Sequence, residues 1–573
     1  MTNFYSFIFI EYIKKSYCIK YVGMLKLCGI FYEKRVKMDQ KTKQQIERRR
    51  TFAIISHPDA GKTTLTEKLL LYGGAIQSAG SVKGKQGDKH AVSDWMELEK
   101  QRGISVTSSV MQFEYNGYCI NILDTPGHQD FSEDTYRTLM AADSAVMVID
   151  AAKGIEPQTR KLFKVCAMRG IPIFTFINKL DHEARDPFDL LDELETEFGI
   201  ATYPMNWPIS CGVTFRGVYD RNQRHILTFD NFHGGRQRLE SITCPIDDTA
   251  RLDELIGADL RQDLIDQTEL LDGAGGDFDL ELVRKGKLSP VFFGSALNNF
   301  GVEQFLESFL KLTTSPLPRK NAEGGSVDPF DEHFSAFVFK IQANMNKAHR
   351  DRITFLRICS GKFERGKEYH HLQGAKNMRL SQPQQMMAQE RDIIDEAFAG
   401  DIIGVFDPGI FSIGDTVCDP QNKVRFSGIP TFAPEHFAII EQVDSMKRKQ
   451  FAKGMNQIAQ EGAIQIFFLP NGGMEKVIVG VVGVLQFDVL KFRMQGEYGV
   501  EYLKQDIPHE YIRRVNLPEF NANDYNLAGD TRWVKDVRGN DLLIFNGQWS
   551  LQWALDKNEG LELTEFSQDI EEA

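Results

Sequence analysis

Residues 52–63, FAIISHPDAGKT, decide the fold of the first part of this chain. The apolar run at residues 52–55 has the length of a buried strand, and residues 63–72 have the spacing of a helix. The loop between them matches the phosphate-binding pattern GxxxxGK[ST], with Ser56 in place of the first glycine. Backbone N–H groups of such a loop and of the following helix bind phosphate oxygens. The stretch therefore predicts a strand–loop–helix unit that binds a nucleotide.

Three residues of this loop have separate predicted roles. Gly61 lets the backbone approach the phosphates, Lys62 neutralises the β- and γ-phosphates, and the hydroxyl of Thr63 ligates Mg²⁺. The predicted phosphate-binding residues are Ser56, His57, Pro58, Asp59, Ala60, Gly61, Lys62 and Thr63.

Strands and helices alternate after this unit. The predicted strands are residues 119–123, 145–149, 171–177 and 288–293, and the predicted helices are residues 157–169, 187–198 and 302–312. Continuous apolar strands that alternate with amphipathic helices indicate a mostly parallel sheet with helices on both faces. The alternation weakens over residues 203–287, which we interpret as an insertion that contains a hairpin and an acidic helix at residues 247–271.

The strand predicted at residues 119–123 ends in a second motif, Asp124, Thr125, Pro126 and Gly127. An aspartate at the end of a buried strand suits a hold on Mg²⁺ through water, and the N–H of Gly127 can contact the γ-phosphate. A simple turn is the alternative, because Asp, Pro and Gly favour turns. The position downstream of a phosphate-binding loop favours the site.

His128 follows this motif directly. A side chain at this point can orient the water that attacks the γ-phosphate, a role that glutamine has in known GTPases. A lone histidine is more often structural, but its place after Gly127 favours a catalytic role.

The strand predicted at residues 171–177 is followed by Asn178, Lys179, Leu180 and Asp181. A carboxylate at Asp181 can accept hydrogen bonds from N1–H and from the exocyclic amine of guanine, whereas adenine lacks that amine and has an acceptor at N1. Such a paired contact discriminates strongly when the mismatched polar group stays buried. The motif predicts GTP and GDP rather than adenine nucleotides, although a helix N-cap at Asp181 is the local alternative.

Two weaker segments complete the predicted site. Ser295 and Ala296 follow the strand at residues 288–293 and are placed to support the base with main-chain groups. Residues 102–105, RGIS, lie before Asp124, where a mobile segment would place the Ser105 hydroxyl on Mg²⁺ when the γ-phosphate is present. A surface loop leading into a strand at residues 106–113 is the alternative. The predicted metal ligands are Thr63, Ser105 and, through water, Asp124.

The chain changes pattern after residue 313. Residues 313–331 hold prolines, glycines and charges and indicate a linker. Short strands with Gly-rich turns predict a β-barrel domain over residues 331–430, and mixed helices and strands predict an α+β domain over residues 435–573. The predicted fold class is an α/β P-loop GTPase domain at residues 38–316, followed by these two domains.

Residues 1–37 differ from the rest and are rich in Phe, Tyr, Ile and Lys. The apolar run at residues 4–10 is too short to span a membrane, and no small-residue cleavage site follows it. We expect a start codon assigned too early, with Met38 as the natural start. A membrane-surface tail and a lineage-specific extension are the alternatives, and a mass measurement of the natural N-terminus separates them.

The ordered motifs resemble those of the translational GTPases, of which the Gly-His pair at residues 127–128 and Arg-Gly-Ile at residues 102–104 are particular features. Longer stretches are similar to the bacterial class II peptide-chain release factors, among them LDTPGHQDFSEDTYRTL at residues 123–139 and VGVLQFDVLKFRMQGEYGVE at residues 482–501. The similarity covers about residues 40–515.

This resemblance implies a ribosome-stimulated GTPase that promotes the dissociation and recycling of class I release factors after peptide release. It implies GTP, GDP and Mg²⁺ as ligands, and ribosomal RNA, ribosomal proteins and class I release factors as partners. Many members of the wider superfamily have threonine where Ser105 aligns, and Pro58 and Ile104 would flank His128 as an apolar pair.

Composition narrows the remaining choices. A formal net charge of −13 excludes a protein that coats nucleic acid through bulk positive charge, so RNA contact needs local basic residues, for which residues 447–453 are candidates. Eight cysteines without a CxxC pair suggest neither zinc nor a disulfide framework, and we expect a cytoplasmic monomer without membrane contact.

The nearest alternative function is a translocation-type elongation or ribosomal-protection GTPase. Such proteins need two further domains, and we expect the roughly 60 residues after Val515 to be too few for them. An ATP-dependent P-loop enzyme is disfavoured by Asp181. A nucleotide sensor without hydrolysis is the third class, and substitution of His128 discriminates it.

Overall fold

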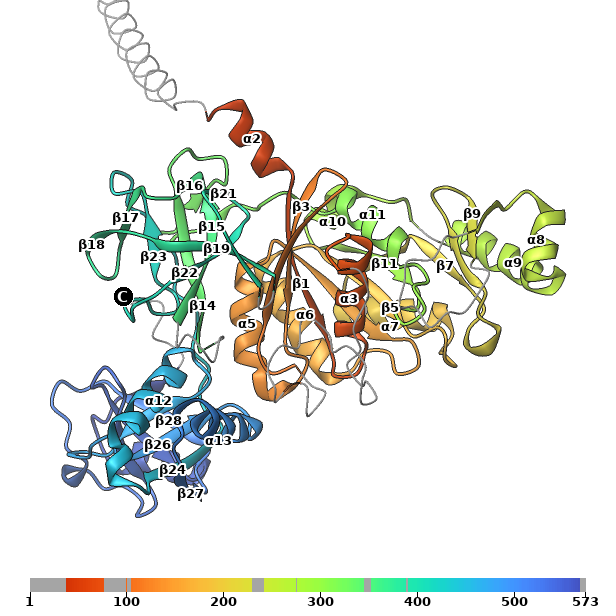
Figure 1. Cartoon of the computed structure of the whole chain (residues 1–573). Coiled ribbons are helices and arrows are strands. Elements are labelled where there is room, and N and C mark those ends of the chain that lie inside the picture. The colour runs from red at the N-terminus through yellow and green to blue at the C-terminus, as the bar shows by residue number, and fades with distance from the viewer. Residues whose placement is uncertain are drawn as a thin grey trace, which may run out of the picture.

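The computed structural model describes residues 38–76, 99, 105–228, 242–274, 276–344, 352–387 and 390–566 (Figure 1). The predicted extension at residues 1–37 lies outside the described residues. So do Arg102, Gly103 and Ile104 of the predicted mobile segment, whereas Ser105 is described.

The apolar strand of the phosphate-loop unit lies in the middle of a mostly parallel sheet. β1 (Arg49–Ser56) pairs in parallel with β3 (Tyr118–Asp124) on one side and β4 (Ser144–Asp150) on the other. The sheet continues in parallel with β5 (Ile173–Asn178), β11 (Leu288–Phe293) and β6 (Ala201–Pro204). β1, β4, β5 and β11 are buried at every residue, which is the pattern that helices on both faces produce. The predicted α/β fold is confirmed.

Alternate residues of β1 point to opposite faces of this sheet. Phe52 and Ile54 belong to the apolar core that α3 (Lys62–Tyr72) and α11 (Val302–Leu312) cover. Ala53 and Ile55 belong to the core on the other face. That face is covered by α5 (Ser132–Ala141), α6 (Pro157–Arg169) and α7 (Pro187–Phe198). The strand is thus fixed on both faces, and so is the loop at its end.

A separate four-stranded antiparallel sheet lies within the region interpreted as an insertion. Its strands are β7 (Asn206–Ile209), β8 (Gly217–Asp220), β9 (His225–Thr228) and β10 (Ile242–Pro245). The single helix expected over residues 247–271 is two helices, α8 (Thr249–Ile256) and α9 (Ala258–Ala274). Gly257 between them has a φ of +87°, which ends the first helix. A short α10 (Leu280–Arg284) leads into β11.

The second domain is a curled antiparallel sheet, a half-barrel, where the sequence predicted a β-barrel. Its longer strands are β14 (Ser335–Ala343), β15 (Arg352–Ser360), β19 (Ser381–Met387) and β22 (Ile402–Phe406). Shorter ones are β17 (Glu368–His371), β18 (Lys376–Arg379), β20 (Glu390–Ile393) and β23 (Thr416–Cys418). β16 (Lys362–Glu364) and β21 (Glu396–Phe398) form a separate two-stranded sheet, and a two-stranded ribbon of β12 (Arg319–Lys320) and β13 (Ser326–Val327) precedes the domain. The helix before β1, α2 (Gln40–Glu47), packs on this domain, because Ile46 lies in its core.

The first two domains share one sheet. β2 (Ser109–Tyr115) pairs antiparallel with β3, and Met111 of β2 pairs with Met387 of β19. Buried ion pairs reinforce the joint: Arg49 with Asp401 at 2.8 Å, and Arg357 with Asp143. Burial opposes the charge of Arg49, but Asp401 outweighs it, so the pKa of Arg49 lies above its ordinary value. Removing one partner would strand a buried charge, and the joint therefore depends on both.

The C-terminal domain is α+β, as predicted. Its eight-stranded sheet has the order β27 (Tyr502–Ile507), β24 (His436–Gln442), β26 (Lys476–Val481), β25 (Gln465–Phe468), β29 (Arg532–Lys535), β30 (Asp541–Phe545), β28 (Tyr511–Val515) and β31 (Leu563–Glu565). Its helices are α12 (Arg448–Gln460), α13 (Leu485–Tyr498) and α14 (Gln548–Lys557). The basic candidates Lys447, Arg448, Lys449 and Lys453 are exposed at the start of α12. Among the helices of the described residues, none combines the length and apolarity that crossing a membrane requires.

Candidate nucleotide-binding site

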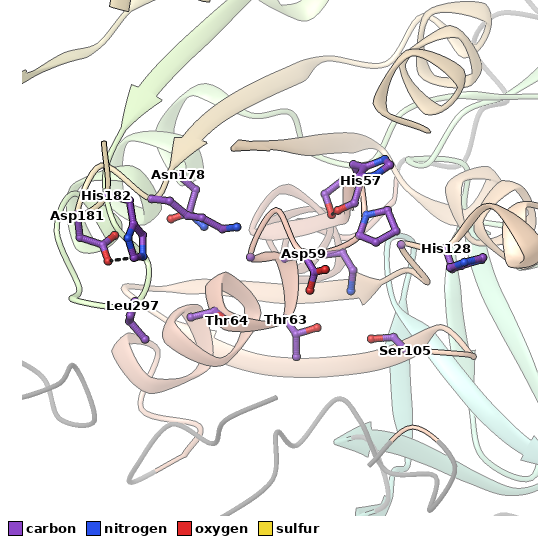
Figure 2. A pocket seen from close by; sticks show the side chains of 16 residues that line it. His57, Asp59, Thr63, Thr64, Ser105, His128, Asn178, Asp181, His182 and Leu297 are labelled. Carbon is purple, nitrogen blue, oxygen red and sulfur yellow. Dashed lines mark hydrogen bonds and ion pairs between the residues drawn. The ribbon is translucent and has the colours of Figure 1, made fainter. Parts of the chain in front are cut away.

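The loops that follow the parallel strands meet at one edge of the sheet and surround a cavity of about 480 Å³ (Figure 2). This volume lies within the range of small-molecule sites. Lys62 and Asp181, predicted to bind opposite ends of one nucleotide, both line it. The full lining is Ser56, His57, Pro58, Asp59, Gly61, Lys62, Thr63, Thr64, Ser105, Gly127, His128, Asn178, Lys179, Asp181, His182 and Leu297.

The loop between β1 and α3 has a backbone that depends on Gly61. Gly61 is the N-cap of α3 with a φ of +97°, a conformation that side chains disfavour. A Cβ atom there would also lie 2.2 Å from Nδ2 of Asn178. Asp59 has a φ of +65° as well. The sharp turn that results leads directly into the first turn of α3, whose N–H groups lie at the cavity.

Lys62 and Asp124, both predicted to act at the phosphates, form an ion pair with each other. Nζ of Lys62 lies 2.6 Å from Oδ1 of Asp124, and both side chains are buried. The Thr66 hydroxyl donates to the same carboxylate oxygen at 3.2 Å. The Thr125 hydroxyl donates to the Ile54 carbonyl at 2.7 Å, which ties the end of β3 to β1. Asp124, Thr125 and Pro126 therefore lie behind the cavity wall, and Lys62 lies in front of them.

The predicted metal ligands form a set of hard oxygen donors. Thr63 and Ser105 both line the cavity, and Figure 2 shows their hydroxyl groups directed toward one another. The carboxylate of Asp124 lies 2.6 Å from Nζ of Lys62, which lines the same cavity. Two hydroxyls and one carboxylate match the oxygen ligands that Mg²⁺ prefers, and they leave room for water and phosphate oxygens. The residues present thus fit Mg²⁺.

The base side is built around Asp181. Its Oδ1 accepts a hydrogen bond from the Ser295 hydroxyl at 2.6 Å, and its Oδ2 lies 3.5 Å from Nε2 of His182. The Leu180 N–H donates to the Gly294 carbonyl at 3.3 Å. Leu180, Ser295 and Ala296 do not line the cavity. Ser295 supports Asp181 through its hydroxyl, and the main-chain contact with the base expected of Ser295 and Ala296 stays a prediction.

Asn178 connects the phosphate side to the base side. Its Nδ2 donates to the Ala60 carbonyl at 2.9 Å, and its Oδ1 accepts from the Ala296 N–H at 2.9 Å. Ala60 and Ala296 are both buried, so neither backbone group has easy access to water instead. Asn178 therefore holds two loops at a fixed separation.

Replacement of Asn178 with alanine is expected to weaken GDP and GTP binding equally, by about 30-fold or more, because two buried backbone groups lose their partners at about 1–3 kcal/mol each and about 1.4 kcal/mol corresponds to a factor of ten. The preference for guanine over adenine nucleotides stays unchanged, since Asp181 is untouched. Titration with fluorescent GDP, GTP and ATP analogues measures both quantities. A selective loss of the guanine preference would contradict the role of Asn178 in holding the two loops at a fixed separation.

Lys179 is held by an ion pair beside the base side of the cavity. Its Nζ lies 2.8 Å from Oδ2 of Asp150, and its backbone has a φ of +73°. Burial raises the pKa of Asp150, but hydrogen bonds from Lys179 and from the Ala152 N–H outweigh burial and place the pKa below its ordinary value. Asp150 is therefore ionised and anchors the ammonium group, which leaves the aliphatic stem of Lys179 along the cavity.

His128 lies at the end of the cavity farthest from Asp181. In Figure 2 its ring is directed away from Thr63 and Ser105. Its Nδ1 accepts from the Asp130 N–H at 3.2 Å and lies 3.1 Å from Oδ1 of Asp130. Asp130 makes both contacts at Nδ1 and neither at Nε2. Asp130 therefore determines which ring nitrogen is available to a ligand.

Three lining residues were missed by reasoning from the sequence, namely Thr64, His182 and Leu297. Leu297 is 53% exposed, and it offers an apolar surface on the same side of the cavity as Asp181 (Figure 2). Its position directly after Ala296 is the signal that would have found it. Thr64 and His182 likewise follow predicted residues directly, so extending each motif by one position recovers all three.

Three family profiles match successive parts of the chain. The elongation factor Tu GTP binding domain matches residues 47–315, the elongation factor G domain 2 matches residues 333–420, and the class II release factor RF3 C-terminal domain matches residues 426–555. The first match covers the cavity, and the third covers most of the C-terminal domain.

Curated relatives match over nearly their whole length. The chain is 58% identical to peptide chain release factor 3 of Symbiobacterium thermophilum, over 90% of this chain and 97% of that protein. It is 51% identical to peptide chain release factor 3 of Gloeobacter violaceus, over 91% and 98%. A crystal structure of a protein from Thermus thermophilus matches with a TM-score of 0.65 at 22% identity, over 84% of this chain and 71% of that one, which supports the fold alone.

Proposed function

Because this chain belongs to the family of peptide chain release factor 3, we propose that it is a ribosome-stimulated GTPase of translation termination. It promotes the dissociation and recycling of class I release factors from the ribosome after peptide release. The observation that carries the proposal is one cavity lined by Lys62, His128 and Asp181, in a chain whose C-terminal part matches the class II release factor domain.

The partners that follow from this function are ribosomal RNA, ribosomal proteins and class I release factors. The protein acts as a monomer in the cytoplasm and without membrane contact. The proposed domain limits are residues 38–316 for the GTPase domain, with an insertion at about 203–287, residues 331–430 for the second domain and residues 435–573 for the third.

The phosphates of GTP bind against the loop between β1 and α3. Lys62 exchanges its partner Asp124 for oxygens of the β- and γ-phosphates, and backbone N–H groups of the loop and of α3 donate to the others. Thr63 and Ser105 would hold Mg²⁺ directly and Asp124 would hold it through water, and the ion would supply positive charge to the phosphates. The short distance between Lys62 and Asp124 supports this exchange, since a nucleotide with its metal supplies a partner to each.

Guanine binds with its N1 edge at Asp181 and with its two faces against the side chains of Lys179 and Leu297. The carboxylate of Asp181 accepts from N1–H and from the exocyclic amine, while Ser295 holds the carboxylate in place. The stem of Lys179 and the side chain of Leu297 offer apolar contact to the two faces of the base.

His128 orients the attacking water through Nε2, and Gly127 contacts the γ-phosphate through its N–H. The ring must turn toward Thr63 and Ser105 to do so, because it is directed away from them (Figure 2). Contact with the ribosome is the event that turns it, which accounts for a GTPase that is slow alone and fast on the ribosome. Orientation and proton handling of this kind contribute about 10²–10⁴-fold to a rate.

The test is the departure of a labelled class I release factor from ribosomes after peptide release. With this protein and GTP, departure should be faster than with the protein and GDP, or with GTP alone. Hydrolysis measured in parallel should rise on addition of ribosomes. Departure that is equally fast with and without the protein would overturn the proposal.

A further inference from the structure

The loop that carries Asp181 is held from outside by residues 210–215 of the insertion, which we call the support loop. The N–H of Gly212 donates to the Leu180 carbonyl at 2.9 Å and to the His182 carbonyl at 3.1 Å. Leu180 and His182 flank Asp181 in the chain, so a single N–H group fixes the backbone on both sides of it. Gly212 and Leu180 are buried, and the Leu180 carbonyl therefore has little access to water as a substitute partner.

The support loop has a conformation that depends on Gly212. Its φ of +63° lies in the left-handed region, which residues with a side chain disfavour. An added Cβ atom would lie 2.8 Å from Oε1 of Glu183. The hydroxyls of Ser210 and Thr214 lie 2.6 Å apart, and the Thr214 hydroxyl donates to the Cys211 carbonyl at 2.8 Å. The loop is thus fixed by its own hydrogen bonds and presents the Gly212 N–H in one orientation.

A second series of contacts leads from the support loop to the carboxylate of Asp181. The ring of Phe215 is 1% exposed and packs edge-to-face on Phe300, with centroids 4.8 Å apart. Phe300 exchanges two backbone hydrogen bonds with Ser295, at 3.0 and 3.1 Å. The Ser295 hydroxyl donates to Oδ1 of Asp181 at 2.6 Å. Phe215 therefore supports the residue whose hydroxyl holds the carboxylate.

Asn206, in β7 of the insertion, fixes the strand that leads to Ser295. Its Nδ2 donates to the Phe293 carbonyl at 3.0 Å, and its Oδ1 accepts from the Phe293 N–H at 2.7 Å. Asn206 is fully buried, and Phe293 is the last residue of β11, two positions before Ser295. The ring of Trp207 packs on the ring of Phe293, with centroids 5.3 Å apart. The insertion therefore contacts both chain segments that meet at Asp181.

The loop around Asp181 needs support of this kind. Lys179, two residues earlier, has a φ of +73°, and such a conformation persists only where the surrounding structure enforces it. A functional side chain must also stay within about 0.5 Å and 10–20° of its productive position. A shift of the backbone at Leu180 or His182 would move both carboxylate oxygens of Asp181, so its two hydrogen bonds to one base would not both survive.

We propose that the insertion is a specificity element, in which Gly212, Phe215 and Asn206 are positioning residues for Asp181. They hold the carboxylate at the angle at which it accepts from both N1–H and the exocyclic amine of guanine. Without them a carboxylate remains at the base, but discrimination against a purine that lacks the amine falls. The inference rests on the proposed function, because it takes guanine as the base.

The test compares the binding of GDP with that of inosine diphosphate (IDP), whose base keeps N1–H but lacks the exocyclic amine. Both compete with a fluorescent GDP analogue for the full chain in the presence of Mg²⁺, so the ratio of their dissociation constants isolates the amine contact. We expect the unmodified chain to prefer GDP by about tenfold or more, the value of a hydrogen bond to a charged group. Gly212→Val places a branched side chain at a positive φ, and it should lower this preference by about threefold or more.

The matched control is Gly199→Val. Gly199 follows α7 with a φ of +64°, nearly the value at Gly212, and an added Cβ there meets no atom within 4 Å. This variant has the same local strain, so it should lose stability to a similar extent and keep the preference for GDP over IDP. A second variant, Phe215→Leu, shortens the contact with Phe300 and keeps an apolar side chain. It should lower the preference by about twofold, and it carries the test if Gly212→Val does not fold.

If the unmodified chain prefers GDP and that preference is unchanged in both Gly212→Val and Phe215→Leu, this inference alone is overturned. An equal fall in Gly199→Val would also overturn it, because strain without contact to the loop of Asp181 would then suffice. Equal binding of GDP and IDP by the unmodified chain would overturn guanine recognition at Asp181 and the inference with it. Ribosome-stimulated hydrolysis of GTP by the unmodified chain is measured separately, so a failure of the proposed function is distinguishable from a failure of the positioning role.

Discussion

Replacement of His128 with alanine is expected to lower ribosome-stimulated GTP hydrolysis by about 10²–10⁴-fold, the contribution of a positioned acid–base or water-orienting group. The affinities for GDP and GTP should stay within about twofold, because the imidazole contacts neither phosphate nor base before hydrolysis. Single-turnover hydrolysis on saturating ribosomes measures the first quantity, and titration with fluorescent nucleotides measures the second.

His225→Ala is a suitable control for this experiment. His225 begins β9 in the separate antiparallel sheet and does not line the cavity, so its loss should leave hydrolysis unchanged. Unchanged hydrolysis in His128→Ala would instead mean that another group orients the water. A loss of nucleotide affinity in His128→Ala would assign the residue to binding.

Replacement of Asp181 with asparagine is expected to lower GTP affinity by about 10³-fold or more, since a site built for hydrogen bonding rejects a mismatched partner strongly. The carboxylate accepts from two N–H groups of guanine, and an asparagine places an N–H donor against one of them. Xanthine carries a carbonyl at the position of the guanine amine, so xanthosine triphosphate should bind the variant better than GTP does. Competition between the two nucleotides measures the switch.

The Asn178→Ala variant provides the comparison for the Asp181→Asn variant. Asn178→Ala weakens all nucleotides alike, whereas Asp181→Asn changes their order. Retention of GTP affinity in Asp181→Asn would show that the base is recognised elsewhere, and it would remove the assignment of guanine specificity to this residue.

Elements with a strong apolar period were predicted well from the sequence. Residues 157–169 and 187–198 each begin at a proline, a residue favoured at the first helical position, and each is followed by a glycine with positive φ. The buried strand at residues 288–293 has an apolar residue at Leu288 and at each of its last three positions. In these places local chemistry and tertiary packing favour the same structure.

The sequence pattern did not reveal some local breaks or the contacts between distant parts of the chain. Gly257 breaks the helix expected over residues 247–271 through its φ, which a helical period does not reveal. α2 reads as a polar helix, yet Ile46 packs into the second domain. The hydrogen bond between Asp130 and Leu485 joins two stretches that each look ordinary alone.

The candidate site was predictable where one residue type has one chemical task. Gly61, Lys62 and Asp181 line the cavity in the places that their roles need. Asn178 belongs to the same motif as Asp181, but its hydrogen bonds go to Ala60 and Ala296, so its position within a motif did not indicate its structural role. The roles of all four stay predictions until the substitutions above are measured.

The buried joint between the first two domains has a consequence for synthesis of the chain. Arg49 and Asp143 are made early, whereas their partners Asp401 and Arg357 emerge from the translating ribosome only after a further 352 and 214 residues. Until then both early charges lie on the open surface of a nascent GTPase domain, solvated and without a desolvation penalty. The first domain can therefore fold as soon as it is made, and it becomes locked to the second only when translation has passed residue 401.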